Sequence, residues 1–570
     1  MKLYLYGHGD GGGGATREHL EFLNREKDLE GMPKVIPENP NKFFEYIDKE
    51  CEITRKYIGE LYFAAHRGTY TSQALTKKLN RKAEFKLREA EMWVALFEKN
   101  EARDELVPLW KEVLFNQFHD IIPGSSIREV YERANAAYQD VIVNSEKVCD
   151  KVINTVVQPI SDCVTVFNSL SWDRTVKIVI PDGYNDVFGK NGSRLPTQCV
   201  DGNVIALVKV PACGYVSYKL ENGEKADEIP HNSLVLENAF VKAEFNKKGE
   251  LISLFDKEKS MEFLTKPSNI FKMYQDMPLY FDAWDIDSFY EKTEIILDAT
   301  TEIIPEYKGD VEQSLIIRRK LNNSELTQRV ILRSDSKRLD FETEVDYKES
   351  HKLLKVDFNT NIQTDEIISE IQFGYIKRPN HKNKQFDQDR FEVCQHKWSA
   401  LAENKRGFAI LNDCKYGISA DGGKMSLTLQ KSAGSPDLNA DKGIHKFTYS
   451  IMPFTENIAD SDIVREGYEL NTKPIVTLGE TGEKSLLNVS EKNVIIDTIK
   501  PAEDGSGDII VRLYESMNTL TSCELILGFD VKGAYITDML ENNKYKVEVA
   551  DNKIRLNLTS FEVKTIRIEL

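Results

Sequence analysis

The chain has 570 residues, more than one hydrophobic core normally spans, so about three or four domains are expected. Its net charge of −17 argues against nucleic acid or an anionic membrane as a partner, but leaves a neutral ligand such as a sugar open. No apolar run reaches the roughly 18–20 residues of a membrane span, and the eight cysteines form no CxxC pair, which indicates the reduced thiols of a cytoplasmic protein.

The first segment predicts one βα unit. Residues 3–6 have the apolar character of a buried strand and run directly into a glycine-rich loop at 7–14, after which a helix follows from about Thr16. The glycines let the backbone approach a ligand closely, and Asp10 stands at the carboxyl end of the strand, where α/β sheets place their chemistry. A flexible N-terminal loop is the alternative. The literal GxGxxG match is too weak to indicate a nucleotide site, because no convincing βαβ unit follows it.

From residue 39 to about 157 the pattern is helical. Apolar stripes with the spacing i, i+3, i+4, i+7 predict three or four amphipathic helices joined by short loops, which is typical of a helical bundle. A polar loop at 65–73 interrupts these helices and contains Arg67. Such a loop either binds a ligand or simply caps a helix.

One of these helices is predicted to end at the only His-Asp dipeptide of the chain, His119-Asp120, with Phe118 as the last residue of its apolar stripe. An imidazole and a carboxylate on a rigid element suit a metal ion or a sugar hydroxyl. The alternative is a helix-terminal histidine that faces the helix dipole, with an aspartate in a turn. Ser126 and Glu129 have the spacing of a capping box, which predicts that the next helix opens there.

After about residue 158 the sequence pattern changes to that of short strands separated by turns, and this pattern continues to the C-terminus. A stretch of this length predicts several β-sandwiches. Tryptophan beside carboxylate suits a sugar ring, although a tryptophan in a sandwich is more often part of the core. Three polar-aromatic segments are therefore candidates for ligand surface: 280–287, 390–398 and 411–417.

Together these segments resemble glycoside hydrolase family 38, the zinc-dependent retaining α-mannosidases, and specifically its cytosolic and bacterial branch. The matching motifs occur in the order of the family across nearly the whole chain, at 7–14, 66–71, 116–120 with 123–125, 282–285, 390–393 with 396–398, and 412–417. The expected fold is a multidomain chain, first α and then all-β. The domains are a remnant of the catalytic α/β domain at 1–38, a helical-bundle middle domain at 39–157, a small β-sandwich part at 158–225, a large mutarotase-like β-sandwich at 226–457 and a C-terminal β-sandwich at 458–570.

The resemblance also implies roles for individual residues. His119 looks like a zinc ligand of the family, Asp120 like a residue that binds sugar hydroxyls, and Asp10 is a candidate acid/base. The remaining substrate-binding candidates are Arg67, Trp284 and Asp285. The family opens with a His-x-Asp zinc motif shortly followed by tryptophan, whereas the only literal His-x-Asp here, at 8–10, lies inside the glycine loop and is read as coincidence. Lys431 stands where this branch tends to have an arginine, and lysine forms no bidentate fork.

The resemblance therefore implies the C-terminal portion of a retaining zinc-dependent α-mannosidase that hydrolyses terminal α-mannosides of oligosaccharides. The isolated chain is expected to be inactive, because one matched imidazole does not make a zinc site. A separately encoded N-terminal catalytic part is an expected partner, and an apolar face left on the helical bundle favours a homo-oligomer. The alternative function is that of a non-catalytic carbohydrate-binding or structural subunit.

Overall fold

The computed structural model describes residues 1–9, 12–98, 102–225, 228–297 and 301–570. The chain forms two compact units, Met1–Tyr62 and Phe63–Leu570. Among the described residues no helix combines the length and the apolar character needed to cross a membrane.

The first unit contains two short helices. α1 (Arg17–Glu26) begins after Thr16, whose hydroxyl accepts a hydrogen bond from the backbone amide of His19, and α2 (Pro40–Glu50) has its proline in the first turn. No residue of either helix is buried. Residues 3–6 form no strand, so the prediction of a buried strand there is wrong. A strand needs a hydrogen-bonded neighbour, and the first unit has no described strand to pair with it.

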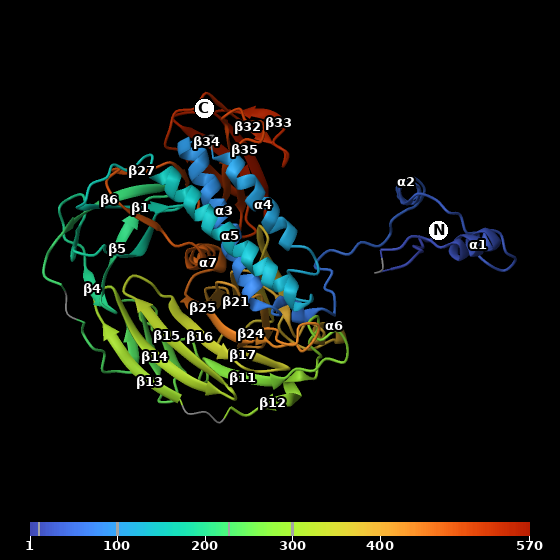
Figure 1. Ribbon diagram of the computed structural model, residues 1–570, viewed down its shortest axis with the longest axis horizontal. Helices are drawn as coiled ribbons and strands as arrows, with labels where there is room; N and C mark the ends of the chain where they lie inside the picture. Colours follow the sequence, from blue (N-terminus) through green and yellow to red (C-terminus); the bar gives the residue numbers. More distant parts are fainter. Residues whose placement is uncertain (10–11, 99–101, 226–227, 298–300) are drawn as a thin grey trace. The chain divides into compact units, whose positions relative to one another are not determined.

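The second unit opens with a layer of helices that run side by side (Figure 1). They are α3 (Ala74–Trp93), continued by the π-helical turn η2 (Val94–Glu98), α4 (Arg103–Asn116) and α5 (Arg128–Ile153). Trp93 is fully buried and packs edge-on against Phe167 at 5.4 Å between ring centroids. It belongs to a core that the helices share with the C-terminal strands. Because α4 ends at Asn116, Phe118 lies beyond the helix and is exposed instead of extending the buried stripe.

The predicted capping box does not form. α5 begins at Arg128, and its N-cap residue Ile127 makes no side-chain cap. The hydroxyl of Ser126 instead donates to the carbonyl oxygen of Asp120 at 2.7 Å. This hydrogen bond closes the turn that carries the His-Asp pair, so the serine stabilises the connection between two helices and not the start of the second one.

A small sandwich follows the helices, with one sheet in the order β26-β1-β6-β27, in which β3 also pairs with β6, and a second in the order β2-β5-β4. Its strands are β1 (Cys163–Asn168), β2 (Arg174–Val179), β3 (Asp186–Phe188), β4 (Thr197–Val200), β5 (Asn203–Val210), β6 (Gly214–Glu221), β26 (Ile475–Leu478) and β27 (Glu483–Ser485). Two of these strands come from far along the chain, which ties the small sandwich to the segment that precedes the C-terminal domain.

The large sandwich has two main sheets, in the orders β12-β11-β17-β24-β23-β20 and β13-β14-β15-β16-β25-β22-β21-β18-β19, and a smaller sheet β10-β9-β8-β7. The main sheets face each other through aromatic rings, since Phe341 of β16 lies 6.1 Å from Phe358 of β17. The strands are β7 (Val235–Glu237), β8 (Val241–Phe245), β9 (Leu251–Asp256), β10 (Met261–Glu262), β11 (Ile270–Gln275), β12 (Glu294–Ile295), β13 (Thr301–Lys308), β14 (Glu312–Leu321), β15 (Ser324–Arg333), β16 (Leu339–Tyr347), β17 (Lys352–Asn359), β18 (Glu366–Ile371), β19 (Gly374–Pro379), β20 (Val393–Cys394), β21 (Trp398–Glu403), β22 (Arg406–Asn412), β23 (Gly417–Asp421), β24 (Lys424–Lys431) and β25 (Gly443–Phe454).

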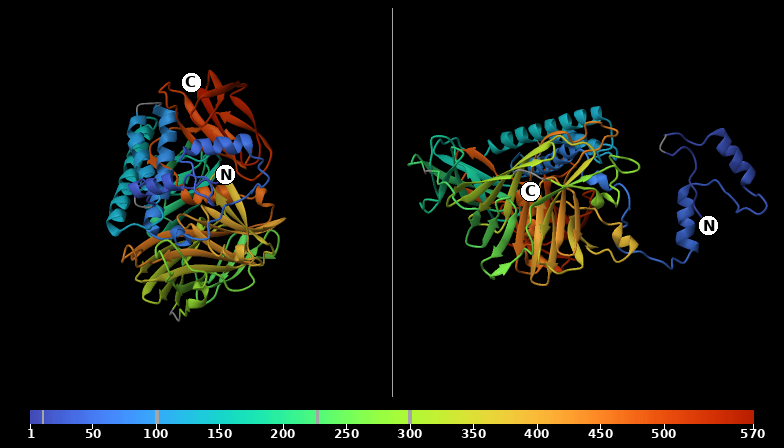
Figure 2. Two further views of the ribbon diagram at one scale, coloured as in Figure 1. Left: turned by 90° about the vertical axis from the view of Figure 1, so that its right-hand side faces the viewer. Right: turned by 90° about the horizontal axis from the view of Figure 1, so that it is seen from below.

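The C-terminal sandwich pairs a sheet β28-β31-β34 with a sheet β29-β30-β35-β32-β33. Within the second unit it lies at the opposite end from the large sandwich, with the helices alongside (Figures 1 and 2). The short helix α6 (Gln385–Gln388) lies in a connection within the large sandwich, and α7 (Ile463–Asn471) lies between its last strand β25 and β26 of the small sandwich. The C-terminal strands are β28 (Leu487–Val489), β29 (Val494–Pro501), β30 (Ile509–Glu515), β31 (Thr521–Leu527), β32 (Gly533–Thr537), β33 (Asn543–Val547), β34 (Lys553–Leu558) and β35 (Val563–Glu569). The predicted order, a helical domain followed by β-sandwiches, is confirmed.

Candidate functional site

Arg67 lies in the short 3-10 turn η1 (Arg67–Tyr70), which precedes α3, and its side chain is buried. Its guanidinium lies over the ring of Phe391 at 4.3 Å and donates two hydrogen bonds to the carbonyl oxygen of Asp389, at 3.0 and 3.2 Å. It also forms an ion pair of 3.5 Å with Asp285. The arginine thus joins three segments that lie far apart in the sequence, and a planar group with a fork of donors suits this task.

Trp284 and Asp285 lie in the loop that follows β11, directly against this turn. The carbonyl oxygen of Trp284 accepts a hydrogen bond from the amide of Gly68 at 2.9 Å, and the indole lies 4.4 Å from the ring of His66. The indole is half-buried, so part of it faces solvent. Asp285 accepts a hydrogen bond from the amide of Ile286 at 2.9 Å. The structure therefore brings Arg67, Trp284 and Asp285 together, while their role as sugar contacts stays a prediction.

His119 and Asp120 lie in the turn between α4 and α5. Their side chains are 74% and 51% exposed and form a pair of 3.4 Å between Nε2 and Oδ2. The imidazole also contacts the ring of Phe118 at 4.2 Å between centroids. Both polar groups are thus presented at the surface, where they are accessible to a ligand.

Buried contacts hold this turn against the turn of Arg67. The ammonium group of Lys77 donates to the carbonyl oxygens of Ile122, at 2.9 Å, and Ser72. Gly124 has φ +92°, and a Cβ there would lie 2.4 Å from the carbonyl oxygen of Ser72. The hydroxyl of Ser72 in turn donates to the carbonyl oxygen of Ala283 at 2.6 Å. The turn of the His-Asp pair, the turn of Arg67 and the loop of Trp284 are therefore connected. We call this region the site face. It is defined by Arg67, which is buried, and by His119, Asp120, Trp284 and Asp285, which are at least partly exposed.

The start of α3 is fixed by a carboxylate from the large sandwich. Asp441 accepts hydrogen bonds from the amides of Gln73 and Ala74, both at 2.7 Å. Burial raises the pKa of Asp441 and lowers the pKa of Lys77, and the attraction between the two charges opposes both shifts. Sequence reasoning missed both residues, because a lysine on an amphipathic helix and an aspartate in a loop are normally solvated.

The described residues do not form a complete metal site. Among them no group of three or more His, Cys, Asp or Glu side chains is placed to hold a metal ion. A catalytic zinc normally has at least three protein ligands. His119 and Asp120 supply two donors at most, so they fit only a shared or partial zinc site. Asp10, the predicted acid/base, lies outside the described residues.

Two of the predicted ligand segments are core instead. Trp398 is fully buried under the strands around it, and in the segment 411–417 Asn412, Cys414 and Lys415 are buried. The apolar area of an indole favours the interior of the sandwich, which outweighs its use as a sugar platform at this position. Lys431 is also fully buried, and its ammonium group is paired with Asp276, which is buried as well. As the structure stands, Lys431 is not exposed to a sugar.

Exposed apolar side chains accompany the site face. Some are at the end of α4 and the turn after it, others are in the loop after β11, and one is in the loop after β24: Leu114, Phe115, Phe118, Ile127, Met277, Leu279, Tyr280, Phe281 and Leu438. Apolar side chains gathered in this way are typical of a surface that another polypeptide covers.

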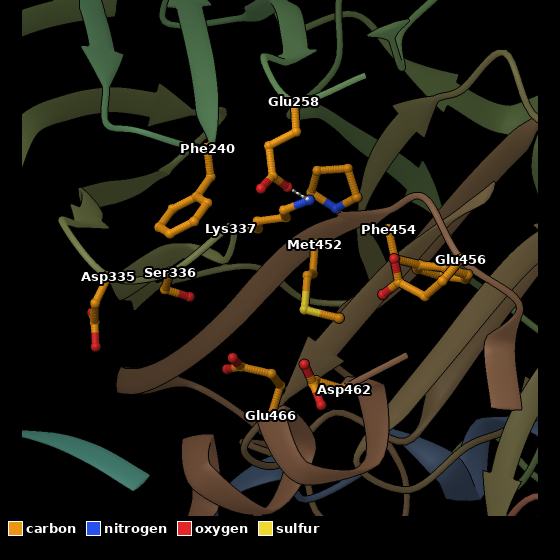
Figure 3. A pocket seen from close by; sticks show the side chains of 11 residues that line it. Phe240, Glu258, Asp335, Ser336, Lys337, Met452, Phe454, Glu456, Asp462 and Glu466 are labelled. Atoms are coloured by element: carbon orange, nitrogen blue, oxygen red, sulfur yellow. Dashed lines mark ion pairs between the residues drawn. The ribbon is translucent and has the colours of Figure 1, made fainter. Parts of the chain in front are cut away.

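A separate hollow of about 310 Å³ lies between α7 and the strand ends of the large sandwich (Figure 3). Carboxylates line it, but they are engaged within the fold. Lys337 pairs with Glu258 at 2.6 Å, Arg338 pairs with Glu466 at 2.6 Å, and Lys492 pairs with Asp462 at 3.2 Å. The hollow therefore shows structural ion pairs and no arrangement that singles out a ligand.

Three family models match the chain: the α-mannosidase middle domain at residues 64–156, the glycosyl hydrolases family 38 C-terminal domain at 236–439, and the family 38 C-terminal β-sandwich domain at 493–566. The chain belongs to glycoside hydrolase family 38. The site face is built at the junction of two of these family 38 domains, because Arg67, His119 and Asp120 lie in the first and Trp284 and Asp285 in the second.

Curated relatives agree with this assignment. The family 38 chain is 33% identical to "Alpha-mannosidase G" of Dictyostelium discoideum over 99% of its own length and 57% of the relative. It is 30% identical to "Alpha-mannosidase 2C1" of Homo sapiens over 100% of its own length and 56% of the relative. The chain thus spans little more than half of these relatives. A solved α-mannosidase from Enterococcus faecalis V583 has the same fold, with a TM-score of 0.79 at 16% identity over 94% of this chain and 72% of that one.

Proposed function

We propose that this chain supplies the middle and C-terminal part of a retaining α-mannosidase that acts on terminal α-mannosides of oligosaccharides. The observation that carries the proposal is the site face, which lies at the junction of two family 38 domains and gathers Arg67, Trp284 and Asp285 beside an accessible His-Asp pair. Relatives at 30% identity and above carry the name α-mannosidase.

The chemistry of the site face suits a sugar. A half-buried indole offers a flat apolar surface to the C–H face of a hexose, and the carboxylates of Asp120 and Asp285 accept hydrogen bonds from its hydroxyls. A retaining glycosidase also needs a nucleophile and an acid/base. We propose Asp10 as a candidate for the acid/base and assign no nucleophile to this chain.

We further propose that His119 is one ligand of a zinc ion whose other ligands come from a catalytic α/β part outside this chain. The lengths of the relatives support this arrangement, because the chain spans only 57% and 56% of them. The apolar side chains around the site face suit a covering partner of this kind. The free state of all eight cysteines supports a cytoplasmic location.

Complementation tests this proposal. The chain is mixed with the N-terminal catalytic part of a family 38 α-mannosidase and zinc, and hydrolysis of an aryl α-mannoside is followed. We expect activity that depends on this chain and that falls by at least about 10–100-fold in His119→Ala, because loss of even an outer group at a metal centre has effects of this size. Arg128→Ala, at an exposed position on α5, serves as the control and should keep full activity.

The rival function is that of a non-catalytic carbohydrate-binding subunit, and the incomplete metal site is what favours it. Calorimetry with methyl α-mannoside separates the two. Binding to this chain together with the absence of hydrolysis in the complemented mixture would support the rival and contradict the enzyme proposal. If the chain has no affinity for the sugar and no effect on hydrolysis, it is a structural subunit.

A further inference from the structure

A buried ion pair lies directly beneath the turn of Arg67. Lys431, the last residue of β24, is fully buried, and its ammonium group pairs with Asp276, which follows β11 and is nearly as buried. Burial raises the pKa of Asp276, and the charge of Lys431 opposes that shift. Two charges removed from water in this way contribute little net stability, so such a pair is better explained by the geometry that it fixes.

The turn that contains Arg67 and Gly68 packs against the side chain of Lys431. A Cβ on Gly68 would lie 2.6 Å from Cε of Lys431 and 2.9 Å from the carbonyl oxygen of Asp285. The Cα of Gly68 therefore packs closely against both the lysine stem and the loop of Asp285, which leave no room for a side chain there. Its amide donates to the carbonyl oxygen of Trp284 at 2.9 Å, which fixes the loop to the turn.

Backbone hydrogen bonds also connect the ion pair to the part of the loop that precedes Trp284. The amide of Asp276 donates to the carbonyl oxygen of His351 at 2.8 Å, and the amide of His351 donates to that of Ser432, the residue after Lys431, at 2.7 Å. Two residues further on, the amide of Gly434 donates to the carboxylate of Asp282 at 2.6 Å. The backbone around the pair thus holds Asp282, while the lysine stem supports Gly68, whose partner is Trp284.

We propose that Lys431 and Asp276 are positioning residues. They fix the position of the Arg67-Gly68 backbone, and through it the placement of Trp284 and Asp285 for a sugar ligand. The proposal rests on the proposed function only for the identity of that ligand. It assigns to Lys431 a role beneath the site face and not a contact with the substrate.

Hydrogen exchange on the full chain tests the positioning role without any ligand. The variant Lys431→Met/Asp276→Asn removes both charges but keeps the length of the lysine stem. We expect the amides of Gly68, Thr71 and Ser72 to lose protection by about tenfold or more, while strand amides of β17 keep theirs, because the opening is local to the turn. Unchanged protection at these three amides would overturn the proposal.

A matched control and a second variant keep the test decisive. Lys397 and Glu370 form another lysine–carboxylate pair, largely buried and 2.7 Å long, at the other main sheet of the large sandwich. The variant Lys397→Met/Glu370→Gln should leave the protection of the three turn amides unchanged, and an equal loss there would mean that the effect is general and not positional.

If the first variant does not fold, Gly68→Ala replaces it, because the added methyl group displaces the turn from the lysine stem by steric contact. It must give the same local loss of protection for the proposal to stand.

Binding then connects positioning to function. With methyl α-mannoside as the probe, Lys431→Met/Asp276→Asn should weaken binding by about tenfold or more, but by less than about twofold in an Asp285→Asn background, because the pair acts through that loop. Full additivity in the two backgrounds would contradict action through Asp285. If the unmodified chain binds no mannoside, the proposed sugar function fails, while the exchange experiment still decides whether the ion pair positions the turn.

Discussion

At the scale of single residues, the candidate site depends on groups that each join distant segments. Arg67 contacts Phe391, Asp389 and Asp285, which are more than 200 positions away in the sequence. A lysine in its place keeps the charge but loses the planar fork and the surface that lies over the phenylalanine ring. The position is therefore sensitive to geometry as well as to charge.

We expect Arg67→Lys to lower the free energy of unfolding of the second unit by about 1–3 kcal/mol, since two hydrogen bonds to a carbonyl oxygen and a cation–π contact are lost. The measurement is the shift of the calorimetric transition. Arg128→Lys is the control, because Arg128 and Glu132 form an exposed pair whose contribution is near zero. Equal shifts for the two variants would show that Arg67 is not a structural link.

Residue types and motif order predicted part of this site, and contacts between distant segments account for the rest. The His-Asp dipeptide and the Asp-Ala-Trp-Asp motif were identified from the sequence, and both are at least partly exposed, on segments that contacts of Ser72 connect. Trp398 also lies in a segment that mixes aromatic and polar residues, like Trp284, but it is part of the core. Local sequence does not tell which face of a strand is covered. Lys77 and Lys431 are buried by tertiary contacts that no local pattern signals.

At the scale of elements, α3 shows a helix start that is made by another domain. Its N-cap residue Gln73 makes no side-chain cap, and the first amides are satisfied by Asp441 from the large sandwich. Capping patterns are read within about four residues, so the sequence predicted the helix but not what holds its end. The same limit explains the failed capping box at Ser126, whose hydroxyl found a partner in the preceding turn.

We expect Asp441→Ala to lower the free energy of unfolding by roughly 2–4 kcal/mol, because two buried amides lose a charged acceptor. Hydrogen exchange at Gln73 and Ala74 should rise with it. Asp462→Ala is the matched control, since Asp462 is the N-cap residue of α7 but makes no side-chain capping bond. A loss of stability in the control as large as that in Asp441→Ala would indicate that the distant cap is unimportant.

We expect Glu91, in α3, to make the stability of the fold depend on pH. Burial raises the pKa of Glu91 to about 7, with Lys500 and a hydrogen bond from Trp110 acting in the other direction. Because the folded protein binds this proton more tightly than the unfolded chain, the stability contributed by Glu91 is present at low pH. It is lost as the pH rises from 4.5, the ordinary pKa of a glutamate side chain, to about 7.

Glu91→Gln should therefore become more stable relative to the unmodified chain as the pH rises through this window, by at most about 3 kcal/mol at pH 8. Thermal unfolding at several pH values measures the difference. Glu105→Gln is the control, because Glu105 is exposed and paired with Lys151 at the surface, and its difference from the unmodified chain should vary little. A constant difference for Glu91→Gln would show that the pKa of Glu91 is the same in the folded and the unfolded chain, and would contradict the shift.

At the scale of the whole molecule, exposed apolar surface determines whether the isolated chain associates with itself. Leu114 and Phe115 at the end of α4, and Phe118 in the turn after it, are exposed beside the site face. We expect the isolated chain to self-associate through this surface, with an average mass in sedimentation that rises with concentration. Phe115→Ser/Phe118→Ser should lower that mass toward the monomer, and Leu520→Ser, at an exposed apolar position near the C-terminal sandwich, should not. A concentration-independent monomer would rule out this behaviour.

We propose that this chain holds part of a mannosidase site and receives its metal and the remaining catalytic groups from a further catalytic part. The most direct measurement is the zinc content of the purified chain after dialysis, together with its hydrolysis of an aryl α-mannoside in the presence of added zinc. We predict well under one zinc per chain and no turnover above buffer, because a catalytic zinc site needs about three protein ligands. About one tightly held zinc per chain, with turnover on the order of 1–1000 per second, would contradict the claim and show that the chain carries a complete active site.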